Sequence, residues 1–307
     1  MQQKSLIGWL GILFRGMAMG AADVVPGVSG GTIAFITGIY EELINSIANI
    51  NLRAIQRLRS EGVKSFWLHI NGNFFAALFI GIGCSVFSLA KLLTHLLENY
   101  PVVVWSFFFG LVVASALFVI KTIKGWNTPI ILALLLGIVV AAYISSLQTT
   151  FDGHQLWYIF ISGAIAICAM ILPGISGAFI LVLLGSYHVI INGIKDVDLK
   201  IISLFGLGCI VGLLLFSRLL KFLFSHYKNI VLAILSGFLI GSLVKIWPWK
   251  NKWGETPIIT HSDGREEFLM ENVMPDKFND EPQLITAIGV AILGFLLVLV
   301  LEKVAKK

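Results

Sequence analysis

A short motif of proline, glycine and serine occurs twice in the chain. The first copy reads P-G-V-S-G at residues 26–30, and the second reads P-G-I-S-G at residues 173–177. The offset is 173 − 26 = 147 residues, and three residues further on also recur at it: Gly38 as Gly185, Tyr40 as Tyr187 and Asn45 as Asn192. Identities of this kind within apolar sequence predict an internal duplication.

Each copy of the motif is expected to end one helix and to start another. Proline lacks a backbone N–H group and glycine tolerates unusual φ angles, so Pro-Gly does not continue a helix. Ser29 and Ser176 stand where N-cap residues stand, directly before a new apolar run. A new helix N-terminus offers unpaired N–H groups and partial positive charge, which suit phosphate or carboxylate. The alternative interpretation is a kink without a ligand.

Two broken helices in one polytopic protein are the sequence pattern of a transporter's central site. Small residues after each serine, Gly30-Gly31 and Gly177-Ala178, would let the two breaks approach each other closely. Arg15 and Asp23 precede the first motif within an apolar segment, where a charge costs at least about 2.5–3.5 kcal/mol. We expect Arg15 to bind an anionic group and Asp23 to balance it. The alternative is that they pair with each other or extend to the membrane interface.

Further ionisable residues are candidates for coupling or gating. Glu41 and Glu42 follow Tyr40, and His188 stands at the position of Glu41 in the second copy. These groups could couple transport to a proton or cation, or lie solvated at a cytoplasmic mouth. Lys91 and Arg218 match at a second offset of 218 − 91 = 127 residues, and could flank two entrances or extend to the interface. Histidine, cysteine and acidic residues show no ligand spacing, so we expect no metal and no cofactor.

Composition places the chain in the membrane. Of its 307 residues, 57% are hydrophobic and 13% are charged, and several segments exceed the roughly 18 apolar residues that mark a span. The sequence therefore predicts an all-α polytopic membrane protein. A net charge of +5, with basic residues gathered in loops, fits the positive-inside rule and not nucleic-acid binding. A homo-oligomer is compatible with the sequence.

We expect two repeats, 1–147 and 148–307, each with one re-entrant helical hairpin and together with about six full spans. The predicted hairpins are 6–50 and 156–194. The predicted spans are 73–97, 102–120, 129–147, 199–224, 230–247 and 284–301. The polar segment 248–282 is expected to be an external loop with little regular structure.

The basic segment 51–69, which holds Arg53, Arg57, Arg59 and Lys64 against one acid, is expected in the cytoplasm. Both chain termini then fall on the cytoplasmic side. Three spans separate the two hairpins, so the hairpins would open to opposite sides of the membrane. The sequence thus predicts an inverted-topology repeat.

Residues 20–40, G-A-A-D-V-V-P-G-V-S-G-G-T-I-A-F-I-T-G-I-Y, together with the second copy, resemble the bacterial polyprenyl-phosphate transporter family over nearly the whole chain. The resemblance implies translocation of undecaprenyl phosphate in the cytoplasmic membrane, with the carrier lipid returning from the outer to the inner leaflet for cell-wall synthesis. Arg15 and Arg218 would be counter-charges for the phosphate. The family motif falls on Asp23, Pro26, Gly27, Ser29, Gly30, Gly31, Thr32, Pro173, Gly174, Ser176 and Gly177.

Two other functions stay open at the level of sequence. A membrane undecaprenyl-pyrophosphate phosphatase has a similar motif, P-G-x-S-R-S-G-x-T, but the Arg-Ser pair is absent between Ser29 and Thr32. Without that arginine a transferring phosphoryl group would lack stabilisation, and Ser29 would lack a base. We therefore expect that the protein is not an enzyme. An ion or small-anion secondary transporter is the second alternative.

Overall fold

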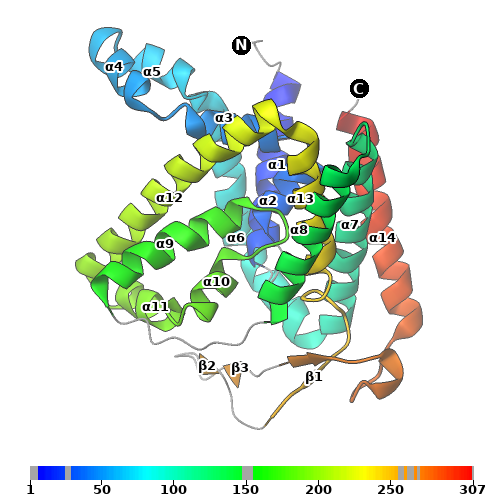
Figure 1. Ribbon diagram of the computed structural model, residues 1–307. Helices are drawn as coiled ribbons and strands as arrows, with labels where there is room; N and C mark the ends of the chain where they lie inside the picture. Colours follow the sequence, from blue (N-terminus) through cyan, green and yellow to red (C-terminus); the bar gives the residue numbers. More distant parts are fainter. Residues whose placement is uncertain are drawn as a thin grey trace.

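The computed structural model describes residues 6–24, 29–146, 155–254, 259–260, 266–267 and 270–305. Helices dominate this part of the chain and pack side by side in one bundle (Figure 1). This architecture, with its long apolar helices, confirms the predicted all-α membrane class.

The first break in a helix lies between α1 (Leu6–Val24) and α2 (Gly30–Ile36). Ser29 is extended, with φ −123° and ψ 136°, and its hydroxyl accepts a hydrogen bond from the N–H of Gly31, so it is the N-cap of α2. The helix ends after seven residues, because Gly38 takes a φ of +74° that favours glycine. The chain then turns into α3 (Tyr40–Ala48).

The second break has the same local structure. It lies between α9 (Leu156–Ile171) and α10 (Gly177–Leu183), and Ser176 caps α10 by accepting from the N–H of Phe179. Gly185, with φ +65°, ends α10, and α11 (Tyr187–Lys195) follows. Each break is therefore followed by a helix of seven residues and then one of nine. Figure 1 places α3 toward the end of the molecule that carries the chain termini, and α11 toward the end that carries the strands.

Six further helices complete the bundle, and they pack in distinct pairs. Their bounds are α6 (Gly72–Asn99), α7 (Pro101–Thr122), α8 (Thr128–Ser146), α12 (Leu199–His226), α13 (Lys228–Ser242) and α14 (Leu284–Ala305). The most extensive contacts join α1 to α6, α9 to α12, α7 to α14 and α8 to α13. Close approach depends on glycine: a Cβ atom at Gly81 would overlap the carbonyl of Leu13, and one at Gly208 would overlap that of Phe160.

Fewer helices than expected meet the length and hydropathy of a full span. Three qualify among the described residues: Pro101–Thr122, Thr128–Ser145 and Leu199–His226. A fourth results if α5 (Val63–His69) and the first part of α6, which meet at 70°, count as one span. The expected spans 230–247 and 284–301 correspond to α13, which has 15 residues, and to α14, which has 22 residues and covers the second span in full. The first of them is short because the chain leaves the helix in a turn at residues 243–246.

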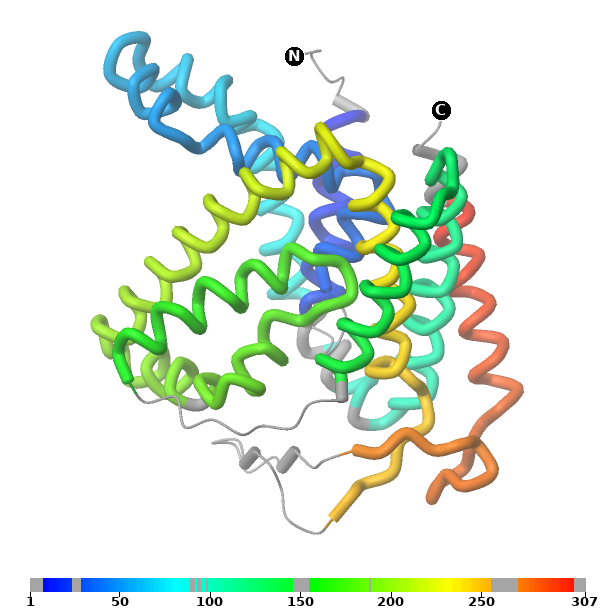
Figure 2. Tube along the Cα trace, viewed as in Figure 1, coloured from blue at the N-terminus to red at the C-terminus, as the bar shows by residue number. Residues whose placement is uncertain are grey.

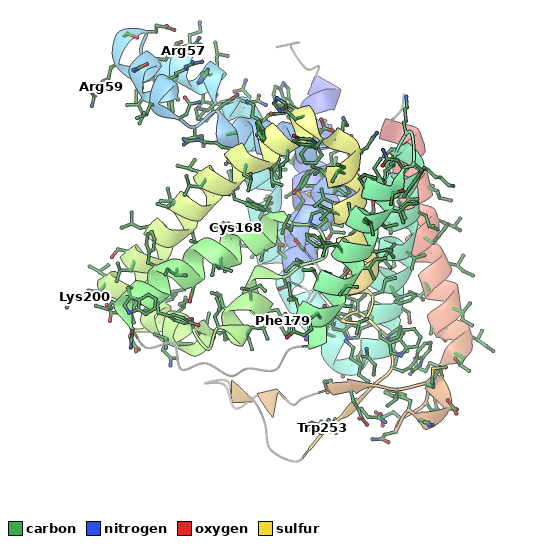
Figure 3. All side chains as sticks on the ribbon, viewed as in Figure 1. Arg57, Arg59, Cys168, Phe179, Lys200 and Trp253 are labelled. Atoms are coloured by element: carbon green, nitrogen blue, oxygen red, sulfur yellow. The ribbon has the colours of Figure 1, made fainter. Side chains whose placement is uncertain are left out.

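The basic segment forms two short helices, α4 (Leu52–Ser60) and α5, which project from the bundle (Figure 1). Asn51 caps α4 by accepting from the N–H of Ala54. Arg57 and Arg59 point away from the bundle (Figure 3). Leu52 on the same helix is 77% exposed, so this projection presents both charge and apolar surface.

The polar segment after α13 is expected to have little regular structure, and its described residues form only short strands and one short helix. Strand β1 (Lys250–Lys252) pairs antiparallel with β4 (Met270–Asn272), and β2 (Ile259–Thr260) pairs with β3 (Glu266–Glu267). A short 3₁₀ helix, η1 (Pro275–Lys277), follows. The indole N–H groups of Trp247 and Trp249 donate to the carbonyls of Val273 and Pro282, each at 2.8 Å, which fixes the ladder against the bundle.

One buried core joins both helix breaks to the long helices. It includes Ile12 of α1, Phe74 of α6, Ile175 of the second break and Leu239 of α13. Figure 2 shows the start of α1 and the end of α14 at one end of the molecule and β1 at the other. The two breaks lie between these ends.

Candidate functional site

The two helix breaks contact each other directly. We call the described residues 23–24 and 29–32 the first tip, and residues 170–177 the second tip. The hydroxyl of Ser29 donates to the carbonyl of Met170 at 3.0 Å, and the N–H of Gly174 donates to the hydroxyl of Thr32 at 2.9 Å. Ser29 and Thr32 are 2% and 1% exposed, and both hydrogen bonds are part-buried. Two segments 147 residues apart thereby form one polar cluster inside an apolar core.

The backbone N–H groups of the first tip already have partners within the protein. Gly30 N–H donates to Asp23 Oδ1 at 2.6 Å, and Gly31 N–H donates to Ser29 Oγ at 3.1 Å. Asp23 therefore occupies the N-terminus of α2, where an anionic ligand was expected. A phosphate could bind these amides only by displacing the carboxylate.

Glycine is required in both tips by the space around it. A Cβ atom at Gly30 would lie 2.5 Å from the carboxylate of Asp23, and one at Gly31 would lie 2.5 Å from the carbonyl of Ile171. Gly174 has φ +83°, a conformation that side chains rarely adopt. The close approach of the tips thus excludes a larger residue at Gly31, whereas a larger residue at Gly30 would require the Asp23 side chain to move.

A small pocket lies beside the second tip. Its lining includes Gly174 and Ser176 from the tip, Ser145 from α8, Phe179 from α10 and Lys245 from the turn after α13. Figure 3 shows Phe179 beside the end of α8. The pocket has a volume of about 10 Å³, which is room for roughly one water molecule. The pocket would have to widen to admit a phosphate group.

Lys245 was not predicted from the sequence. Its Nζ atom lies 4.0 Å from the centroid of the Phe179 ring, which brings an ammonium group to the pocket beside Ser176. The motif gave no indication of it, because Lys245 belongs to neither copy. The available signal was its position at the end of the predicted span 230–247 that was assigned to the outside, where lysine is less common.

Arg15 lies within α1 and is partly buried. It stands roughly 12 Å along the helix from Asp23, at ~1.5 Å per residue. Among the described residues it makes no hydrogen bond and no ion pair, so Arg15 and Asp23 do not pair with each other. Pro26 and Gly27 lie outside the described residues, and Pro173 is buried in the second tip.

Arg218 lies apart from the tips. Its guanidinium donates to the carbonyl of Ile50 at 3.3 Å, and Lys221, one turn later on α12, donates to Asn49 at 3.1 Å. Both residues therefore bind the C-terminal end of α3, where cations are favoured by the helix dipole. This placement accounts for Arg218 without a ligand.

Among the candidate coupling residues, the two whose side chains the structure describes, Glu41 and Glu42, bind partners outside the tips. Glu41 forms a salt bridge with Lys228 at 2.6 Å, and both side chains are about half exposed. Glu42 accepts from the amide of Asn71 at 3.1 Å. Lys91 and His188 belong to α6 and α11, and their side chains lie outside the described part of the structure. No group of three or more potential metal ligands occurs among the described residues.

The fold and the site define a class: a polytopic α-helical membrane protein in which two broken helices meet at a buried polar cluster. The chain belongs to the family described as undecaprenyl phosphate translocase-like, whose model matches residues 19–263. The family's name indicates a transporter and not an enzyme.

Two curated relatives agree with this family. A polyprenyl-phosphate transporter of Vibrio cholerae serotype O1 is 41% identical over 307 residues, covering 98% of each chain. A polyprenyl-phosphate transporter of Staphylococcus aureus is 31% identical over 258 residues, covering 78% of this chain and 86% of the relative. No solved structure matches the chain significantly.

Proposed function

We propose that the protein moves undecaprenyl phosphate across the bacterial cytoplasmic membrane and returns this carrier lipid from the outer to the inner leaflet. The observation that carries the proposal is the direct contact of the two tips. Contact between Ser29 and Met170 and between Thr32 and Gly174 brings both broken helices to one place. Membership of the family and the names of both relatives support the lipid class.

The arrangement of helix pairs supports an inverted repeat. If α1, α6, α7 and α8 are matched with α9, α12, α13 and α14, the pair α1–α6 becomes α9–α12. The pair α7–α14 becomes α13–α8, which is also an observed pair. Because α3 and α11 lie toward opposite ends of the molecule (Figure 1), the two hairpins would open to opposite leaflets. Such a scaffold permits alternating access to one central site.

The headgroup would bind at the tips while the isoprenoid tail stays in the lipid. Asp23 already accepts the N–H of Gly30, so the phosphate and this carboxylate would compete for the same donor. Arg15 supplies positive charge on the preceding helix. In the orientation that the positive-inside rule favours, α4, α5 and both termini face the cytoplasm and the strands face outward.

Reconstituted liposomes test this function. Undecaprenyl phosphate is distributed over both leaflets, and an impermeant phosphatase reports the fraction that reaches the outer surface. Wild-type protein should expose nearly the whole pool, while protein-free liposomes expose about half. A pool that stays about half protected when the wild-type protein is present would refute transport.

Two variants and two side assays separate the alternatives. Arg15→Ala and Ser29→Ala should each slow the exchange, and unchanged rates in both would remove the headgroup model. Phosphate release from undecaprenyl pyrophosphate by purified protein would favour an enzyme. Uptake of a water-soluble anion that does not depend on lipid would favour a small-anion transporter.

A further inference from the structure

The turn after α13 brings a lysine to the second tip. Residues 243–246 leave the helix, and Lys245 projects to the ring of Phe179, with Nζ 4.0 Å from the centroid. Cation–π contact of this kind orients the ammonium group. The same pocket is lined by Ser145 and Ser176. One lysine and two serines therefore line one small space.

A second lysine lies directly behind the first. The ammonium of Lys250 donates to the carbonyl of Lys245 at 2.5 Å and lies 4.1 Å from the centroid of the Trp105 ring. Lys250 thus fixes the backbone of Lys245 from the side of β1. The positive charge of Lys245 also acts on Lys250, and a nearby anion would offset it.

A phosphate monoester fits this set of groups. Lysine is a common phosphate ligand because its ammonium is a compact charge with three donors. Serine hydroxyl groups add hydrogen bonds that a monoester oxygen accepts. The pocket adjoins Gly174, whose N–H bonds to Thr32 of the first tip, so an anion in it would lie next to the contact between the tips.

We propose that Lys245, with Ser145 and Ser176, binds the phosphate of the lipid on the side of the second tip that faces the strands. Lys250 is a positioning residue that holds the turn. This assignment rests on the proposed function and deepens it, because it replaces Arg218 by Lys245 as the counter-charge of the second repeat. The bound state requires Phe179 and Lys245 to move apart, since the pocket is nearly closed in this structure.

Binding of a short substrate analogue tests the assignment. Farnesyl phosphate and the uncharged farnesol are titrated into purified full-length protein in detergent, and binding is measured by calorimetry. Lys245→Met and Lys245→Gln should each weaken farnesyl phosphate binding by about 10-fold or more, since one charge-assisted contact is lost. Farnesol binding should not change, and Lys245→Arg should bind farnesyl phosphate within about threefold of wild type. Lys252→Met is the matched control on the neighbouring strand.

The outcomes separate this site from the function itself. If wild-type protein exchanges undecaprenyl phosphate in liposomes but both neutral Lys245 variants bind farnesyl phosphate as well as wild type does, the assignment is overturned and the function stands. If both variants also lose farnesol, the residue acts through folding and the assignment is again overturned. If wild-type protein exchanges no lipid, the function fails, whatever the variants bind.

Discussion

Thr32 lies on α2 and Thr37 is the C-cap of the same helix, but their hydroxyl groups have different partners. Thr32 accepts from the N–H of Gly174 in the other tip, whereas Thr37 donates to the carbonyl of Ile33 in its own helix at 2.7 Å. Removing the hydroxyl of Thr32 leaves a part-buried N–H group without this acceptor. Leaving this N–H group without an acceptor lowers the free energy of unfolding by about 1–3 kcal/mol. Loss of the hydrogen bond from Thr37 to its own helix should change the free energy of unfolding only slightly.

Thr32→Val should therefore lower the thermal stability and slow lipid exchange, and Thr37→Val should change both only slightly. Thermal unfolding in detergent and the liposome assay measure the two effects. Equal decreases in melting temperature and exchange rate in both variants would show that the hydrogen bond between the tips contributes no more than the one within α2.

The lowered pKa of Lys250 should make the stability of the protein depend on pH. Burial, and to a smaller extent the positive charge of Lys245, lower the pKa of Lys250 from 10.5 to about 7. Between pH 7 and pH 10.5, the unfolded chain binds more protons at this residue than the folded one. The free energy of unfolding therefore rises as pH rises through that window. Below pH 7 the protein bears the full free-energy cost of burying a charged Lys250.

The melting temperature of wild type relative to Lys250→Met should thus increase from pH 7 to pH 9.5. Scanning fluorimetry in detergent at several pH values measures the difference, and Lys252→Met serves as the exposed control. A difference that is constant over this range would contradict the lowered pKa.

Residue types in the motif predicted the N-caps but not the residues from distant segments that contact the motif. Ser29 and Ser176 were recognised because an N-cap has a local signature, and the structure has them capping α2 and α10. The bond from Ser29 to Met170 and the pocket contribution of Lys245 depend on the three-dimensional approach of distant segments, which no local pattern contains. The phosphate-binding and coupling roles of the motif residues stay predictions.

At the scale of elements, close helix packing is set by single glycines. Gly81 on α6 faces the backbone of α1, and a Cβ atom there would overlap Leu13, while Gly83 on the same helix has open space around it. Gly81→Ala should destabilise the α1–α6 pair by a few kcal/mol, as overpacking does, and Gly83→Ala should be neutral or slightly stabilising. Thermal unfolding of both variants measures the contrast. Similar melting temperatures would mean that α1 and α6 can separate without loss.

Helix type and membrane class were predictable because long apolar runs and Pro-Gly breaks are local signals. The strands after α13 were not predicted, because β1 pairs with β4 across about twenty residues of polar sequence with no alternating apolar pattern. Trp247 and Trp249 hold this segment against the bundle. Their indole N–H groups bond to carbonyls of the same segment, which composition does not reveal.

For the whole molecule, the proposed orientation places Arg59 on α4 and Trp253 after β1 on opposite sides of the membrane. Both side chains are exposed, and the chain's own cysteines are Cys84, Cys168 and Cys209. In a background without these cysteines, Trp253→Cys should react with an impermeant maleimide in intact cells. Arg59→Cys should react only after the membrane is opened. Labelling of both positions from the same side would refute the inverted arrangement.

The two proposed repeats differ at a position that lies in the contact between the tips. Asp23 and Met170 correspond at the 147-residue offset: the first uses its carboxylate to accept the N–H of Gly30, and the second offers its carbonyl to Ser29. A dimer assembled from two copies of the first half would gather two acidic groups at its centre, and one from two second halves would have none. In the proposed repeat, the two halves would therefore not be interchangeable at this position.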